Sequence, residues 1–497
     1  MSNTARSSSP PRGRWAAFAV VLVAVFMDLV DGTMVSVALP RVQADLQATD
    51  AEVQWIVAAY LLAFALGMIP GGRLGDVHGR RRVFLVGTAL FVLSSVVCGA
   101  AASGGVLVAG RVAQGLGAAL MVPQAMALIV QVFGPEERPR AFVVYGAVLS
   151  LANVGGPLLG ALFLHVDPLG LGWRGLFYVN VPIGLLALLG ALRWMPESRS
   201  SEVRRVDLLG LALLVAATSA VMVPLVQGRE AGWPWWTVAL AVLAVPLFAA
   251  FHRSQRRRGL GEDALVPPAL LRRRSFTVGL VVMFAVYSVL SSLFVVLHYA
   301  LQLGLGWTPM GAALVVVGFP LGVLATTSIA QRYVQVAGRR LVQVGLSVIC
   351  LATAGLALAL GDVARSGGAW TIALPIAVMG LGMGLCVSIL TSIALVEVPA
   401  RHAGAGSGVA NAVLQCGGAF GVAVVGTLYF GLLTAGSATA SDHLGAAAAA
   451  LGYHLVVLVV SLALTPFLPR SAVASAEGAE EVPPVTERSA TGDRPTR

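Results

Sequence analysis

Apolar segments of roughly 20 residues recur along the whole chain of 497 residues, and they limit the folds that it can adopt. Such a segment can cross a bilayer as a helix, and in lipid only helices and closed barrels satisfy every backbone polar group. Only 11% of the residues are charged, whereas a soluble domain has about 25%. The pattern predicts an all-α polytopic membrane protein with fourteen spans, which begin near Trp15, Val53, Val83, Gly105, Phe142, Phe177, Asp207, Trp235, Phe276, Met310, Leu341, Trp370, Gly406 and Leu444.

The positions of the basic residues predict the orientation of these spans. The formal charge is +10 at pH 7, and every basic residue is arginine. If both termini lie inside, the outward loops contain Arg41, Arg174, Arg229 and Arg365, Arg111 lies within a span, and all other arginines face the cytoplasm. This asymmetry obeys the positive-inside rule. We therefore expect a multi-pass protein of a bacterial cell membrane (plasma or inner), with both termini cytoplasmic and no nucleic-acid partner.

The inward turn Gly71–Phe84, with the sequence GGRLGDVHGRRRVF, is far more polar than the apolar segments on either side. A weaker copy at 331–342 repeats its G-R-R spacing, but Gln335 stands where the first copy has an acid. The copy suggests two six-span halves around two extra spans, a plan common in secondary transporters. The expected parts are a cytoplasmic tail at 1–14, a first half at 15–195, two extra helices at 196–252, a cytoplasmic linker at 253–275, a second half at 276–469 and a disordered cytoplasmic tail at 470–497.

Five segments resemble motifs of the major facilitator superfamily or of one of its groups. Leu107–Ala119 in span four looks like its R-x-x-Q-G motif, and Gly155–Ala161 in span five is similar to its G-P-x-x-G antiporter motif, two glycines of which are alanine here. Leu29–Pro40 in span one resembles the L-D-x-T signature of the fourteen-span drug:proton antiporters, and Trp173–Gly184 is similar to their start of span six. The inward turn resembles the superfamily's G-x-L-x-D-x-x-G-R-R loop, carried by Gly72, Leu74, Asp76, Gly79, Arg80 and Arg81. The resemblance covers the chain apart from its tails, and it implies the major facilitator fold and exchange of drugs for protons.

The energy source follows from the absence of lysine. An ATP-driven pump needs a phosphate-binding loop with the sequence G-K-[ST], and a chain without lysine cannot form one. Transport must therefore use an ion gradient unless a separate subunit supplies ATP. Two acids, Asp28 and Asp31, lie inside span one, and Arg111 is the arginine inside a span. Asp31 and Arg111 lie at equal depth, about 10 Å from the outer ends of their spans, so they can pair.

The roles of these charged residues have alternatives. The resemblance supports proton coupling by Asp31 and Arg111, although the pair could simply pin two helices together. Asp28, one helical turn away, could be a second proton site, a contact for a cationic substrate or a rim residue. Asp76 can pair with an arginine or cap a helix N-terminus, and the resemblance implies a conformational switch, the alternative being a solvated orientation loop.

The span-five motif has a backbone role. Gly156 and Gly160 are four residues apart, so they form a bare stripe on which another helix can pack closely, and Pro157 is expected to kink the span. The resemblance implies that this stripe seals an antiporter against leak, whereas the simpler interpretation is ordinary close packing.

The remaining polar residues of the spans predict the substrate pathway. We expect Gln114 first, from its place in the span-four motif, and after it the residues Tyr60, Asn153, Tyr287, Asn411 and Gln415. The sequence thus predicts a monomeric proton-coupled exporter of amphipathic organic compounds, such as drugs or antibiotics, that works by alternating access. It needs no cofactor, metal or catalytic residue. The alternatives are export of an endogenous metabolite, lipid or siderophore by the same cycle and, more remotely, a membrane-embedded enzyme, although neither H-E-x-x-H nor G-x-S-x-G occurs.

Overall fold

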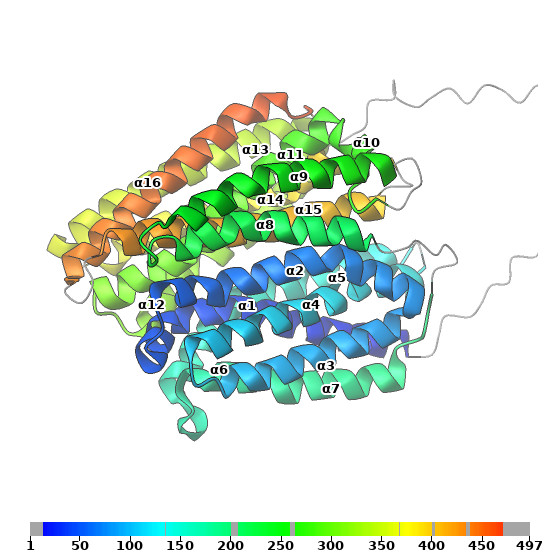
Figure 1. Cartoon of the computed structure of the whole chain (residues 1–497), viewed down its shortest axis with the longest axis horizontal. Helices are drawn as coiled ribbons and strands as arrows, with labels where there is room; N and C mark the ends of the chain where they lie inside the picture. The colour runs from blue at the N-terminus through cyan, green and yellow to red at the C-terminus, as the bar shows by residue number, and fades with distance from the viewer. Residues whose placement is uncertain are drawn as a thin grey trace, which may run out of the picture.

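The computed structural model describes residues 13–134, 136–199, 207–258, 264–366, 368–399, 403–433 and 438–470. The two predicted tails lie almost entirely outside these ranges. Within them the chain folds into sixteen α-helices joined by short turns (Figure 1). They are α1 (Arg14–Leu46), α2 (Asp50–His78), α3 (Arg80–Gly99), α4 (Gly104–Val132), α5 (Arg138–Val166), α6 (Gly175–Tyr178), α7 (Asn180–Trp194), α8 (Leu208–Gln227), α9 (Trp235–Arg258), α10 (Pro268–Leu271), α11 (Arg274–Tyr299), α12 (Pro309–Val316), α13 (Gly318–Ser366), α14 (Ala369–Leu395), α15 (Ala403–Gly431) and α16 (Ala440–Leu464).

The helices confirm the predicted all-α membrane class. Thirteen helical segments of the described chain are long and apolar enough to cross a membrane. One of them, Pro309–Leu360, has 52 residues and would be about 78 Å long at 1.5 Å per residue, more than twice the hydrocarbon thickness. The backbone of Ala337 inside it is not helical (φ −129°, ψ 22°). The number of fourteen spans stays a prediction. Counting the long segment as two spans that meet at Ala337 would give this number.

The helices form two bundles and an additional pair. Helices α1–α7 pack on one another and form what we call the first half, and α11–α16 form the second half (Figure 1, blue to cyan and yellow-green to red). Helices α8 and α9 pack together, and α8 also contacts α2 and α15. The additional pair therefore lies against both halves.

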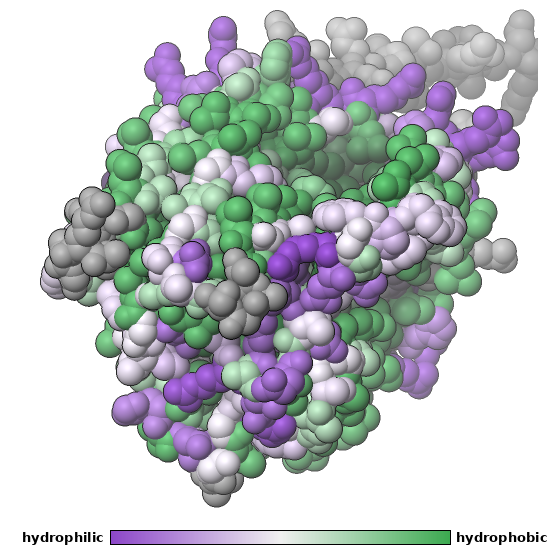
Figure 2. All heavy atoms as spheres, turned by 60° about the vertical axis from the view of Figure 1, so that its left-hand side comes forward, coloured by the Kyte–Doolittle hydropathy of each residue, from purple (hydrophilic) through white to green (hydrophobic). Residues whose placement is uncertain are grey.

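The outer surface of the bundle suits a lipid environment. Large apolar side chains are exposed along the helices, among them Trp235 and Val245 on α9 and Leu351 and Leu358 on α13. Figure 2 shows broad green areas of hydrophobic side chains between the purple hydrophilic groups. Burying these side chains in acyl chains rather than in water is favourable, so the exposed apolar surface supports a multi-pass membrane protein.

The two ends of the bundle differ in charge. One end carries the α2–α3 turn with Arg80 and Arg81, the last turn of α9 and the start of α11, and we call it the arginine-rich end. The opposite end carries the α1–α2 turn around Gln47. This difference provides the reference direction for the site described next.

Candidate functional site

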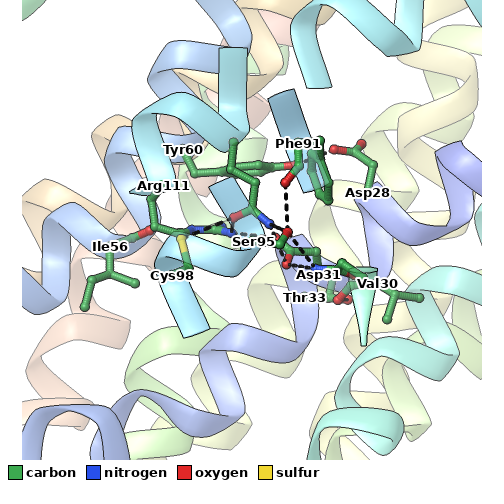
Figure 3. Close-up of polar contacts among 12 residues, drawn as sticks. Asp28, Val30, Asp31, Thr33, Ile56, Tyr60, Phe91, Ser95, Cys98 and Arg111 are labelled. Atoms are coloured by element: carbon green, nitrogen blue, oxygen red, sulfur yellow. Dashed lines mark hydrogen bonds and ion pairs between the residues drawn. The ribbon is translucent and has the colours of Figure 1, made fainter. Parts of the chain in front are cut away.

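The predicted pair of Asp31 and Arg111 is present in the interior of the first half (Figure 3). Nη1 of Arg111 lies 2.5 Å from Oδ2 of Asp31, and the two side chains are 1% and 0% exposed. The same guanidinium donates from Nη1 to Oε1 of Gln114 at 2.7 Å and from Nε to the carbonyl of Ile56 at 3.0 Å. The pair therefore joins α1 to α4 and, through Ile56, to α2.

Asp31 is enclosed by further donors. Nε2 of Gln114 donates to its Oδ1 at 3.0 Å, and Nδ2 of Asn180 donates to the same oxygen at 2.7 Å. Ser95 of α3 receives bonds from both amides, at 2.9 Å from Gln114 and 3.4 Å from Asn180. Asn180 and Ser95 were not among the predicted site residues. The only signal in the sequence was an isolated amide at the start of span six, within the motif Trp173–Gly184.

Asp28 occupies a different environment, although it is only one turn from Asp31. Its side chain is 3% exposed, and its Oδ1 accepts a hydrogen bond of 2.5 Å from the hydroxyl of Tyr60. The guanidinium of Arg111 lies over the Tyr60 ring, 4.0 Å from its centroid, as in a cation–π contact. Asp28 lines the cavity described next, whereas Asp31 does not.

A cavity of about 940 Å³ lies between the two halves. Helices α1, α2, α4 and α5 form one wall, and α11, α13, α14 and α15 form most of the other. Its lining is mostly apolar, with aromatic side chains from Phe64, Phe294 and Phe319. A cavity of this size and composition can hold an amphipathic organic molecule.

Five of the six predicted pathway residues line this cavity, namely Tyr60, Asn153, Tyr287, Asn411 and Gln415. Gln114, which we expected first, does not. Its side chain is completely buried and is held by Asp31, Arg111 and Ser95. The placement of Gln114 is therefore corrected, because its amide lies behind the cavity wall and braces the charged pair.

The charged residues of the described cavity wall all belong to the first half. They are Asp28, Arg73, Asp76 and Arg111. The second half supplies uncharged polar groups, including Tyr287, Ser291, Asn411 and Gln415. This agrees with the absence of a deep acid from the last six predicted spans.

The cavity reaches one end of the bundle more closely than the other. Its lining includes Gly72, Arg73 and Asp76 at the arginine-rich end. At the opposite end, hydrogen bonds join the two halves: the Tyr299 hydroxyl donates to Oε1 of Gln43 at 2.7 Å, and Nε2 of Gln302 donates to the carbonyl of Val37 at 3.0 Å. The halves are thus tied together at the end away from the arginines.

The sequence allowed two contacts for Asp76 in the polar turn, a pair with an arginine or a cap on a helix N-terminus, and the structure has the first. Asp76 lies in the last turn of α2 and pairs with Arg80, the first residue of α3, with 2.9 Å between Oδ1 and Nη2. It therefore pairs with an arginine, and it does not cap α3, whose N-cap is Gly79 at φ +107°. A side chain at Gly79 would be strained there and would also overlap the carboxylate of Glu197. Glu197 accepts the backbone N–H of Arg81 at 3.3 Å, so the turn is attached to the segment after α7.

The glycine stripe of α5 packs directly on α1. A Cβ atom at Gly156 would overlap the hydroxyl of Thr33, and one at Gly160 would press on Met34. At Gly155 the nearest atom within reach belongs to Leu159 on the same helix, 3.8 Å away. Pro157 lies within α5 and lines the cavity. The close packing expected of Gly156 and Gly160 is therefore observed, and its partner is the helix that carries Asp28 and Asp31.

Similarity to known proteins indicates the family of this chain. The family model described as Major Facilitator Superfamily matches residues 21–422. The probable actinorhodin transporter of Streptomyces coelicolor is 40% identical over 454 residues, which cover 90% of this chain and 77% of that protein. The puromycin resistance protein pur8 of Streptomyces alboniger is 36% identical over 88% of this chain and 86% of its own length.

Other relatives and a solved structure extend the comparison. The tetracenomycin C resistance and export protein of Streptomyces glaucescens is 32% identical over 84% of this chain and 76% of its own length. Among solved structures, an auto-inhibited peptide transporter of the POT family superposes with a TM-score of 0.64 at 16% identity, covering 91% of this chain and 96% of that one. At such low identity the superposition shows a shared fold alone.

Proposed function

Since this chain belongs to the major facilitator superfamily and is a multi-pass membrane transporter, we propose that it exports amphipathic organic compounds, such as antibiotics, in exchange for protons. The observation that carries the proposal is the mainly apolar cavity between the halves, which has the buried Asp28 and Arg111 in its wall and Asp31 paired with Arg111 behind it. Relatives named for actinorhodin, puromycin and tetracenomycin C support this cargo class.

We further propose that the arginine-rich end faces the cytoplasm, as the positive-inside rule requires. The cavity would then open toward the cytoplasm, while the hydrogen bonds of Tyr299 and Gln302 close the outer side. In this proposal the first half at 15–195 and the second half at 276–469 rock against each other, and the helices at 196–252 remain beside both. The structure would correspond to the state that accepts cargo from the cytoplasm.

Proton coupling is assigned to the first half in this proposal. Protonation of Asp31 would remove the negative charge that holds Arg111, and it would weaken the link between α1 and α4. Because α1 also packs on the α5 stripe and carries Asp28 at the cavity wall, a change in this link can reach the cavity. The proton state of the cluster would thus bias the arrangement of the helices around the cargo.

Antibiotic sensitivity of cells with and without the gene tests the function. The gene is expected to raise the tolerated concentration of a subset of amphipathic antibiotics by about tenfold. A protonophore is expected to remove this difference. Metabolite profiles of the same cells separate antibiotics from an endogenous metabolite, lipid or siderophore as cargo. Efflux that continues unchanged after the proton gradient has collapsed would contradict proton exchange.

If the polar turn acts as a conformational switch, changes in it are expected to alter the rate of efflux only modestly. The Asp76–Arg80 pair is partly exposed, so it contributes up to about 1 kcal/mol, which corresponds to about fivefold in a rate or a ratio of states. Asp76→Asn is expected to slow efflux by no more than this factor and to leave the affinity for cargo unchanged. Arg80→Gln should have the same effect, and the double variant should add nothing. A large loss of affinity in Asp76→Asn would count against a switch.

A further inference from the structure

The turn between α8 and α9 contacts the first half at the end of the bundle away from the arginine-rich end (Figure 1, green beside blue at the left). Nη1 of Arg229 lies 2.9 Å from Oδ2 of Asp50, the first residue of α2. The neighbouring Glu230 accepts the backbone N–H of Ala51 at 2.7 Å. A carboxylate is favourable there, because the first N–H groups of a helix have no partner within it. The additional pair is therefore attached to α2 by two charged side chains.

Asp50 connects this turn to α1 and α11. Its second oxygen, Oδ1, accepts from Nε2 of Gln43 at 3.0 Å, and Oε1 of Gln43 accepts the hydroxyl of Tyr299 at 2.7 Å. An ionised carboxylate can only accept, so the amide nitrogen of Gln43 must face Asp50 and its oxygen is left for Tyr299. The four side chains form a continuous chain of contacts that we call the relay: Arg229, Asp50, Gln43 and Tyr299.

The relay ends on a side chain that is fixed within the second half. Tyr299 is 1% exposed. The centroid of its ring lies 5.9 Å from that of Tyr429 and 5.3 Å from that of Phe430, both in α15. The hydroxyl of Tyr429 is hydrogen-bonded to Nδ1 of His443 in α16, at 2.8 Å. Because Tyr299 is held by this aromatic group, the bond to Gln43 depends on the orientation of the amide from the first half.

Helix α8 also contacts the second half, close to the same turn. Oγ1 of Thr427 in α15 lies 2.6 Å from the carbonyl oxygen of Leu225, four residues before Arg229. A Cβ atom at Gly426 would overlap the side chain of Gln54 in α2, so α2 and α15 approach closely here. The additional pair therefore reaches both halves at the end where Tyr299 and Gln43 join them.

We propose that Arg229 is a positioning residue for the closed outer end of the transporter. The inference rests on the proposed function, in which this end faces away from the cytoplasm. Asp50 is 30% exposed and Arg229 is 27% exposed. Without the guanidinium, the carboxylate can turn toward water, and the amide of Gln43 loses the partner that directs its oxygen to Tyr299.

The additional pair thus stabilises one of the two states of the transport cycle. Opening of the outer end requires the halves to separate there, so the bond between Tyr299 and Gln43 must break. Arg229 touches neither the cavity wall nor the cluster around Asp31, and it acts on the cycle through Asp50 and Gln43. Its loss is expected to raise the population of the outward-open state without changing the groups that bind cargo or protons.

Labelling from the outside measures that population. Ser36 is the residue of α1 in the cavity wall that lies nearest to the α1–α2 turn, and it is 8% exposed. Ser36→Cys is introduced as a reporter, and right-side-out vesicles are treated with a membrane-impermeant maleimide. The reagent reaches the reporter only when the outer end opens, so the initial rate is proportional to the open fraction while this fraction is small. The protein without Ser36→Cys gives the background from the native cysteines.

Arg229→Gln is expected to raise the labelling rate about fivefold, the ratio that corresponds to a partly exposed ion pair. Asp50→Asn breaks the same pair from α2 and should act alike. Tyr299→Phe keeps the ring packing and removes the hydroxyl, so it should also raise the rate. Arg229→Gln combined with Tyr299→Phe should label no faster than Tyr299→Phe alone, because both changes interrupt one relay. Arg229→Lys keeps the charge for a single contact and should retain most of the wild-type behaviour.

Arg174 provides the matched control. It forms another partly exposed ion pair at the same end, with 2.5 Å between its Nη1 and Oδ2 of Asp45. Both residues belong to the first half, so this pair does not contribute to the contact between the halves. Arg174→Gln removes the same charge as Arg229→Gln and is expected to leave the labelling rate of the reporter unchanged.

Three results would overturn the inference: an unchanged rate in Arg229→Gln, an equal increase in Arg174→Gln, or effects of Arg229→Gln and Tyr299→Phe that multiply. The proposed function fails on a different measurement. If efflux ignores the proton gradient while the relay variants label as expected, proton exchange is wrong and the role of Arg229 stands. If efflux depends on the gradient while Arg229→Gln labels like the wild type, the positioning role alone is wrong.

Discussion

Replacement of Asp31 by asparagine is expected to abolish proton-driven export and to destabilise the protein. Asparagine has nearly the same shape, but it leaves the Arg111 guanidinium buried without its counter-charge. Removal of one partner from a buried ion pair costs about 3–5 kcal/mol. The new side chain also offers one acceptor oxygen where Asp31 offers two, although Arg111, Gln114 and Asn180 all donate to this site.

A double variant separates the structural part of this effect from the coupling part. Asp31→Asn with Arg111→Gln removes both charges, so it should regain most of the stability while remaining unable to couple export to protons. Thermal unfolding of the purified proteins and proton-driven transport in inverted vesicles measure the two properties. Normal transport by the single variant would refute the coupling role. Normal transport by the double variant would show that the pair merely pins α1 to α4.

Replacement of Gly156 by valine is the second change with a large expected effect. The new side chain would occupy the position of the Thr33 hydroxyl on α1, and helix packing would have to open. Overpacking of this kind costs about 1–3 kcal/mol. It would also displace the helix that carries Asp28 and Asp31. We therefore expect loss of export together with a lower unfolding temperature.

Gly155 provides the matched control for this substitution. It lies in the same helix, and among the described residues a Cβ atom there would meet Leu159 of α5 alone, at an ordinary distance of 3.8 Å. Gly155→Val changes helix propensity as Gly156→Val does, so the difference between the two variants isolates the contact with α1. Export assays and thermal unfolding of both variants provide the comparison. Equal losses at the two positions would show that the stripe has no special role.

The depth of a residue in the membrane could be predicted from the sequence, but its direction around the helix axis could not. Asp31 and Arg111 were paired correctly because each is an isolated charge in an apolar segment, and equal depth leaves few partners. Gln114 was predicted to face the cavity, but it lies behind the cavity wall. Because α4 is apolar around most of its circumference, its weak amphipathic pattern does not show which side of the helix faces the cavity. Depth alone cannot distinguish a cavity wall from the layer behind it.

Neutral polar partners were harder to predict. Asn180 donates to Asp31 at 2.7 Å and Ser95 accepts from Gln114 at 2.9 Å, yet serine and asparagine occur in many membrane helices as general contacts between helices. For Asp76, three arginines follow within six residues, so the turn alone could not identify Arg80 as the partner. The two-bundle fold could be predicted because it depends on the lengths of the apolar segments and on the charges of the loops, which do not depend on the direction of any single side chain.

The restriction of charged cavity residues to the first half has a consequence for adaptation. Tyr287, Asn411 and Gln415 contact the interior of the cavity from helices that supply no charged group to its described wall. Substitutions at these three positions can reshape the space for a new antibiotic while the charged groups of the first half, to which we assign proton coupling, stay intact. We expect selection for resistance to unfamiliar compounds to enrich changes on that uncharged wall, and acquisition of a new cargo would then leave the ion exchange unaltered.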